Sequence, residues 1–184
     1  MTPTRKRDLL SETLSLPIVF DGTKSPTKTA LFIILCTAWI VSGLTGHDPW
    51  KPDEAAAFAP IQAMLGGGSW IVPTLAGTPF FDHAPLYYWI ATITGNVFGG
   101  LFPPHDAARL ASGVCTAVTL WCLALTAIEL NGARAGRIAV VILIGSLGLL
   151  LRAHEINPDL AGLMGASASL YGVIIARRRP ARGA

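Results

Sequence analysis

Four stretches of the chain are long, apolar and almost free of charge. They are residues 29–46, 107–130, 138–151 and 160–176. A helix that crosses a bilayer needs about 20 mainly apolar residues, and stretches of this length are close to that requirement. Charged residues make up only 14% of the chain, against about 25% in soluble domains. The sequence therefore predicts four transmembrane helices.

The basic residues indicate how these helices are oriented. They gather near the two ends of the chain and in the short segment 131–137. Segments rich in Lys and Arg stay on the cytoplasmic side of a membrane. This predicts a cytoplasmic tail at residues 1–28, a basic cytoplasmic end at residues 177–184, and outer loops at residues 47–106 and 152–159. The net charge of +3 is too dispersed for a nucleic-acid partner, which needs one continuous basic face.

Residues 84–100 decide whether this topology holds. If they crossed the membrane, the later basic clusters would lie outside, against the positive-inside tendency. We therefore expect a juxtamembrane helix here on the outer face. A second one is expected in residues 54–65, with Asp53 at the N-cap, a bend at Pro60 and an end at Gly66. The resulting fold is an all-α membrane protein with four transmembrane helices and juxtamembrane helices in a large first outer loop.

The three cysteines fall inside apolar stretches. Cys36, Cys115 and Cys122 are interpreted as small buried hydrophobic residues, because their spacing follows no disulfide or metal-binding pattern. They contribute to packing rather than to chemistry.

Acidic residues of the first outer loop are the first candidates for chemistry. A carboxylate can take a proton from a substrate hydroxyl or hold a metal ion, and Asp53 and Glu54 lie at the start of a predicted helix. The alternative is that Asp53 only caps this helix and Glu54 favours its dipole. Both readings stay open.

Further candidates flank the other predicted helices. Asp82 and His83 could bind a divalent cation, or protonated His83 could stabilise a phosphate; they could also simply form a polar helix entry. Arg109 and Arg152 could hold a lipid phosphate or snorkel to the interface. Asp159 could cap the last helix. On the predicted topology, the carboxylates of both outer loops meet on one side of the membrane.

Four segments in a fixed order resemble a known family. KPDEAAAFAPIQAML, GGGSWIVPTLAGTPFFDHAPLYYW, AARLASGV and HEINPD look like the N-terminal portion of the GT-C membrane glycosyltransferases of the protein mannosyltransferase and aminoarabinose transferase group, glycosyltransferase family 39. The likeness covers about residues 43–176. It implies a polyprenyl-phosphate-linked sugar donor, an inverting transfer, and an active site on the outer face of a bacterial inner membrane.

The resemblance also implies residue roles. Asp53 matches the acidic residue of the family's first outer loop, Asp159 a second acidic position after a proline, and Arg109 a recurrent arginine. Asp82 stands where Glu is usual and His83 where Lys is common. Ser69 and Ala84 also depart from the family pattern, where Asp and Pro are frequent.

These roles combine into one functional hypothesis. The chain transfers a sugar from a polyprenyl phosphate to an envelope glycolipid such as lipid A, to another glycan or to a protein. The catalytic carboxylates are Asp53, Glu54, Asp82 and Asp159, the donor phosphate contacts are His83, Arg109 and Arg152, and a divalent metal of unknown identity is expected at Asp53, Asp82 and His83. Family members are longer, so the expected partners include a separate chain with the missing helices besides membrane lipids. The alternative is a non-catalytic remnant or assembly partner that binds polyprenyl lipid.

Overall fold

The computed structural model describes residues 26–46, 48–49 and 51–178. Most of the predicted cytoplasmic tail 1–28 and of the basic end 177–184 lies outside these residues. The described chain is mainly helical, with one short hairpin. The elements are α3 (Pro26–Val41), α4 (Pro52–Leu65), β1 (Thr74–Leu75), β2 (Thr78–Pro79), α5 (Leu86–Phe98), α6 (Pro104–Asn131), α7 (Ala133–Ile144), α8 (Leu147–Arg152) and α9 (Asp159–Arg178).

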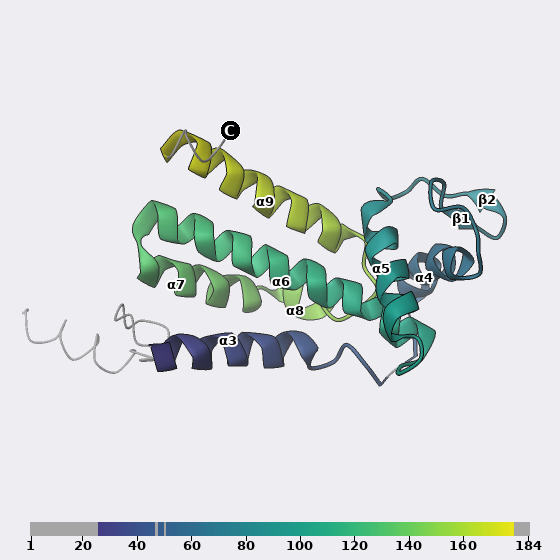
Figure 1. The fold of residues 1–184 in the computed structure, drawn as a ribbon, viewed down its shortest axis with the longest axis horizontal. Helices are drawn as coiled ribbons and strands as arrows, with labels where there is room; N and C mark the ends of the chain where they lie inside the picture. Colours follow the sequence, from purple (N-terminus) through teal and green to yellow (C-terminus); the bar gives the residue numbers. More distant parts are fainter. Residues whose placement is uncertain (1–25, 47, 50, 179–184) are drawn as a thin grey trace, which may run out of the picture.

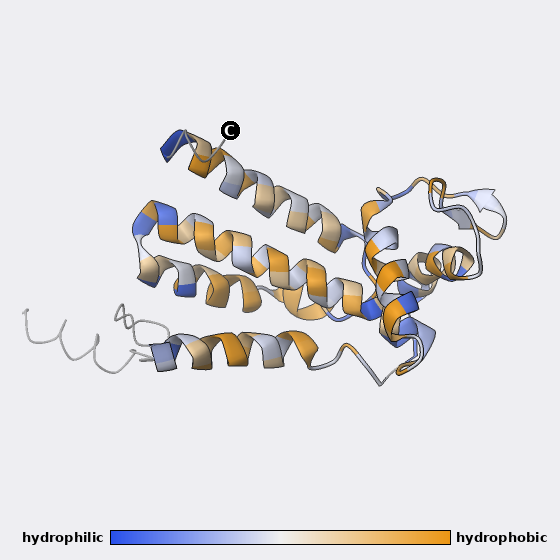
Figure 2. Ribbon diagram, in the orientation of Figure 1, coloured by the Kyte–Doolittle hydropathy of each residue, from blue (hydrophilic) through white to orange (hydrophobic). Residues whose placement is uncertain are grey.

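The elements form two parts. Helices α3, α6, α7 and α9 run along the long axis as a bundle, and α4, α5 and the hairpin gather at one end of it (Figure 1). Helix α6 lies at the centre, packed against α7, α9 and α5. Helices α3, α6 and α7 consist mainly of hydrophobic residues, while the most hydrophilic residues lie toward the two ends of the bundle (Figure 2).

Two of the described helices are long and apolar enough to cross a membrane. They are α6, with 28 residues, and α9, with 20. Helix α6 is about 42 Å long at 1.5 Å per residue, more than the roughly 30 Å of a hydrocarbon core. The helices predicted at residues 107–130 and 160–176 are thereby confirmed. Helix α3 is apolar but shorter, and the crossing of four helices stays a prediction.

The single helix predicted over residues 138–151 is wrong, because the chain breaks between α7 and α8. Ser146 is extended, with φ −71° and ψ 131°, and its hydroxyl donates to the carbonyl of Leu143 at 2.7 Å. Serine side chains compete in this way for backbone groups, and the preceding Gly145 has low helix propensity. The predicted loop 131–137 is also wrong: only Gly132, with φ 87°, separates α6 from α7.

The predicted helix in the first outer loop is present but begins earlier. Helix α4 starts at Pro52 with Lys51 at the N-cap, and no side chain caps it. Proline is favoured at the first helical position, so the expected N-cap role of Asp53 is wrong. The helix ends before Gly66, as expected. Beyond it, residues 74–79 form the hairpin β1–β2, which turns at Ala76 and Gly77, both with positive φ.

Small residues let the helices of the bundle approach closely. A Cβ atom on Gly136 would lie 2.6 Å from Ile128 Cγ1, and one on Gly113 would lie 2.8 Å from Leu44 Cδ1. These two glycines therefore allow α7 and the segment after α3 to pack on opposite ends of α6.

The buried core lies where α4, α5 and α6 meet. Ile61, Tyr87, Tyr88, Ala108 and Ala111 are fully buried there. The rest of the bundle exposes large apolar side chains, and α3 buries none of its residues completely. Cys115 is buried, as predicted, whereas Cys36 and Cys122 are half-buried.

Candidate functional site

A polar cavity of about 290 Å³, referred to below as the acidic cavity, lies at the end of the bundle that carries α4 and α5. It is enclosed by the start of α4, the segment before α5 and the segment 152–159. All of the predicted site residues except Arg109 line it: Asp53, Glu54, Asp82, His83, Arg152 and Asp159. The structure thus brings together carboxylates that are far apart in the sequence. Their chemical roles stay predictions.

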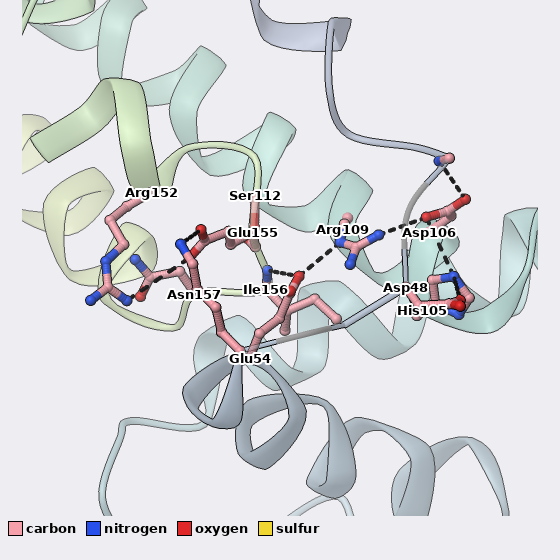
Figure 3. A network of polar contacts seen from close by, with 12 residues as sticks. Asp48, Glu54, His105, Asp106, Arg109, Ser112, Arg152, Glu155, Ile156 and Asn157 are labelled. Atoms are coloured by element: carbon pink, nitrogen blue, oxygen red, sulfur yellow. Dashed lines mark hydrogen bonds and ion pairs between the residues drawn. The ribbon is translucent and has the colours of Figure 1, made fainter. Parts of the chain in front are cut away.

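Glu54 is held at the back of this cavity by two other parts of the chain. Its Oε1 atom accepts hydrogen bonds from Arg109 Nε at 2.8 Å and from the backbone N–H of Ile156 at 3.0 Å (Figure 3). The Glu54 side chain is only 1% exposed. One carboxylate therefore joins α4, α6 and the segment between α8 and α9.

Arg109 is fully buried and lies outside the cavity lining. Its Nη1 atom donates to Asp106 Oδ1 at 2.8 Å, and Asp106 Oδ2 accepts from the N–H of Gly46 at 3.0 Å. A buried cation is stable only when it is paired with anions, and here it has two carboxylate partners. The alternative reading in which Arg109 snorkels to the membrane surface is therefore wrong.

The second carboxylate oxygen of Glu54 differs from the first. Oε2 is buried and has no hydrogen-bond partner among the residues that the structure describes. A buried acceptor without a donor is costly. Glu54 is therefore hydrogen-bonded through one carboxylate oxygen only among the described residues.

Asp53 and Arg152 lie at the open side of the cavity. Asp53 is 81% exposed, and its Oδ2 atom is 4.0 Å from Arg152 Nη1. Arg152 Nη1 is also 3.9 Å from Glu155 Oε2, and Lys51 Nζ contacts Glu155 Oε1. Asp53 and its neighbour Glu54 therefore lie in different environments. The Asp53 carboxylate is accessible to a substrate, whereas the Glu54 carboxylate is buried and held by hydrogen bonds.

His83 and Asp159 form the other side of the site. His83 Nδ1 lies 3.5 Å from Asp159 Oδ1. Burial first, and then the carboxylates of Asp82 and Asp159, raise the pKa of Tyr88 to about 12. The buried Tyr88 hydroxyl therefore stays protonated to a higher pH than an ordinary tyrosine.

A hydrogen-bonded chain behind the cavity involves residues that the sequence did not single out. The N–H of Asn157 donates to Tyr87 Oη at 3.2 Å, Tyr87 Oη is 2.6 Å from Ser112 Oγ, and Ser112 Oγ donates to the carbonyl of Glu155 at 2.5 Å. Because the Ser112 proton goes to the carbonyl, the Tyr87 hydroxyl must donate to Ser112. Burial raises the pKa of Tyr87.

This chain fixes the segment 155–157 to α5 and α6. The apolar face of the predicted helix at residues 84–100 could have indicated Tyr87. Nothing in the sequence pattern indicates Ser112, whose role depends on the tertiary contact alone.

The predicted metal site contains no cluster of ligand side chains in the described part of the chain. No group of three or more His, Cys, Asp or Glu side chains lies close enough there to hold a metal ion. Asp53, Asp82 and His83 line the same cavity, but they do not form such a group. The divalent metal stays a prediction.

Comparison with known proteins gives a family and several relatives. The family model of dolichyl-phosphate-mannose-protein mannosyltransferases matches residues 82–182. An undecaprenyl phosphate-alpha-4-amino-4-deoxy-L-arabinose arabinosyl transferase of Pseudomonas aeruginosa (strain LESB58) is 32% identical over 122 residues, which are 66% of this chain and 22% of that protein.

Two further relatives have the same transferase name. Transferase 1 of Pseudomonas fluorescens (strain Pf0-1) is 32% identical over 135 residues, 72% of this chain and 23% of that protein. The Edwardsiella ictaluri transferase is 30% identical over 121 residues, 65% of this chain and 21% of that protein. The chain thus spans about a fifth of the length of these curated relatives. No solved structure matches it.

Proposed function

The chain belongs to the dolichyl-phosphate-mannose-protein mannosyltransferase family, and we propose that it forms the acidic part of a membrane glycosyltransferase site. The observation that carries this proposal is the cavity that gathers Asp53, Glu54, Asp82 and Asp159. The reaction is the transfer of a sugar from a polyprenyl phosphate to an envelope glycolipid such as lipid A, to another glycan or to a protein.

The names of the relatives support the donor class. They specify an undecaprenyl phosphate donor and a 4-amino-4-deoxy-L-arabinose sugar. A sugar of this kind has an amino group that is protonated at neutral pH, and carboxylates attract such a cation. The acidic lining of the cavity therefore suits an amino sugar.

We assign the proton transfer to Asp53, because its carboxylate is the exposed one next to the fixed Glu54. Asp53 takes the proton of the acceptor hydroxyl. The acceptor oxygen then bonds to the anomeric carbon, while the bond from that carbon to the phosphate oxygen breaks. The electron pair leaves with the polyprenyl phosphate, and attack from the opposite side inverts the anomeric centre.

The remaining residues position and neutralise charged groups. Arg152 is half-exposed at the cavity edge and can pair with the leaving phosphate, as can His83 when it is protonated. Asp82 and Asp159 provide supporting carboxylates. Because Arg109 is buried, we assign it the role of holding Glu54 in place rather than the predicted contact with the phosphate.

The proposed topology places this cavity on the outer face of the membrane. The basic residues Arg134, Arg137 and Arg178 belong to the helix ends at the opposite end of the bundle from α4 and α5 (Figures 1 and 2). Since basic residues favour the cytoplasm, this arrangement supports a cytoplasmic N-terminus. Helix α3 and the pair α7–α8 would supply the two crossings besides α6 and α9.

A chimaeric enzyme tests the function. Residues 26–178 of this chain replace the corresponding segment of the Pseudomonas aeruginosa transferase, and transfer of aminoarabinose is measured in membranes. Asp53→Asn should lower the rate at least about 100-fold, as expected for loss of a general base. Asp48→Asn is the matched control, because Asp48 is 93% exposed and faces His105 rather than the cavity.

Two results would count against the proposal. An Asp53→Asn chimaera as active as its parent would remove Asp53 from the mechanism. A purified chain that binds undecaprenyl phosphate, combined with an inactive parent chimaera, would favour the alternative of a lipid-binding assembly partner.

A further inference from the structure

A second cavity lies between α3, α6 and α7, three helices that run side by side away from α4 and α5 (Figure 1). Its volume is about 640 Å³, within the range of about 300–1,000 Å³ that is typical of small-molecule sites. Most of its lining is apolar and includes Phe32, Cys36, Leu120, Trp121, Ile128 and Val140. We refer to it as the apolar groove.

The way the helices pack explains the groove. Near its C-terminal end, α3 approaches α6 at Gly113, where a Cβ atom would lie 3.4 Å from Ile40 Cγ2. Gly136 draws α7 onto α6 in the same way. Where α3 does not pack closely against α6 and α7, the groove opens between the three helices.

Basic residues lie at one end of the groove. Arg137 lines it, and its Nη2 atom donates to Thr29 Oγ1 of α3 at 3.1 Å. Lys28 and Arg134 occupy the first turns of α3 and α7 beside it. Among the residues that the structure describes, Glu129 near the end of α6 is the acidic one at this end, and its backbone carbonyl accepts from Arg178 Nη1. The described residues at this end therefore carry a net positive charge.

We propose that the apolar groove binds an anionic phospholipid of the cytoplasmic leaflet. The acyl chain lies against the apolar lining, and the phosphate pairs with Arg137 and Arg134. Basic pockets between membrane helices on the cytoplasmic side bind anionic head groups, and arginine forks suit phosphate oxygens. A lipid supplies an apolar chain joined to an anionic head, which matches both features of the groove. This site is separate from the acidic cavity, and lipid binding in the apolar groove does not depend on transferase activity.

Tryptophan quenching by brominated lipids tests the proposal on the full chain. Trp121 lines the groove and is 66% exposed. In a variant with Trp121 as the single tryptophan, reconstituted in phosphatidylcholine vesicles, quenching by brominated phosphatidylglycerol is compared with quenching by brominated phosphatidylcholine. We expect an apparent preference of roughly five-fold for the anionic lipid, about that contributed by one basic residue near a bilayer surface.

Two controls separate the groove from general surface attraction. Arg137→Gln combined with Arg134→Gln should reduce the preference to below about two-fold, whereas Arg177→Gln, at the end of α9, should leave it unchanged. A variant with Trp39 as the single tryptophan should show equal quenching by both lipids, because Trp39 packs against His154 near the acidic cavity.

The proposal is overturned by equal quenching of Trp121 by the two lipids in the parent sequence, a comparison that needs no arginine variant to fold. It is also overturned if neither lipid quenches Trp121, which would mean that a protein segment fills the groove. A preference that Arg177→Gln lowers as much as the groove variants would likewise refute it.

Discussion

Glu54 and Arg109 form the central electrostatic contact of the described chain. Both side chains are almost completely removed from solvent, and their atoms Oε1 and Nε are 2.8 Å apart. Taking two charges out of water is unfavourable, and only their pairing and additional hydrogen bonds offset it. Asp106 and the N–H of Ile156 supply those bonds. At the scale of single residues, the site thus depends on one buried group of charges.

The first prediction follows from this pairing. Arg109→Met leaves Glu54 and Asp106 buried without their cation, which should cost about 3–5 kcal/mol of stability. Arg152→Met removes the same charge from a side chain that is 51% exposed and should cost less than about 1 kcal/mol. Melting temperatures in detergent measure both. Equal melting temperatures for the two variants would contradict the assigned pairing.

The second prediction concerns pH. The pKa of Tyr88 is raised from its ordinary value of 10.0 to about 12 in the folded chain. The unfolded chain therefore loses this proton first, so the stabilising contribution is complete below pH 10 and disappears as the pH rises toward 12. Tyr88→Phe should lose less stability between pH 9 and pH 11 than the parent does, as measured by thermal melts at both pH values. An equal or larger loss in the variant would show that Tyr88 does not titrate in this way.

At the scale of helices, the length of an apolar run predicted where a long helix forms. It did not predict where local backbone contacts start or interrupt a helix. The runs that became α6 and α9 contain no strong break, so their position followed from hydrophobicity. The run at residues 138–151 is equally apolar, but the helix is interrupted at Gly145 and Ser146, where the extended Ser146 donates its hydroxyl hydrogen to the carbonyl of Leu143. The N-cap of α4 was misplaced because Pro52 starts the helix one residue before Asp53.

The third prediction tests the packing of α7 on α6. Gly136→Ala places a Cβ atom 2.6 Å from Ile128 Cγ1 and 3.0 Å from the carbonyl oxygen of Ala124. This overlap should cost about 1–3 kcal/mol. Gly172→Ala is the matched control in α9, where no atom lies within 4 Å of the added carbon. Melting temperatures should fall for the first variant alone, and an unchanged value for Gly136→Ala would refute the close approach.

At the scale of the whole molecule, the sequence predicted which carboxylates would share one end of the bundle. That prediction needed only the basic residues and the positive-inside rule, and the cavity lining agrees with it. The finer contacts could not be predicted in this way. The Glu54–Arg109 pair, the Tyr87–Ser112 contact and the place of Ile156 join residues 25 to 102 positions apart, and apolar periodicity carries no information about such pairs.

The fourth prediction tests the orientation of the bundle. In a variant without native cysteines, single cysteines at positions 53 and 159 should react with a membrane-impermeant maleimide added outside the cell, and a cysteine at position 134 should react only after permeabilisation. All three positions are exposed in the structure, so access depends on the side of the membrane. Labelling of position 159 from the cytoplasm while position 53 reacts from outside would overturn the topology.

The bond between Glu54 and the backbone of Ile156 also sets an order of events during biosynthesis. Glu54 leaves the ribosome 102 residues ahead of its partner, and Arg109 emerges between the two. The Glu54 carboxylate can therefore meet Arg109 first, and it reaches the backbone of Ile156 only after α7 and α8 have been translated. The acidic cavity is complete only once Asp159, the first residue of α9, has also emerged.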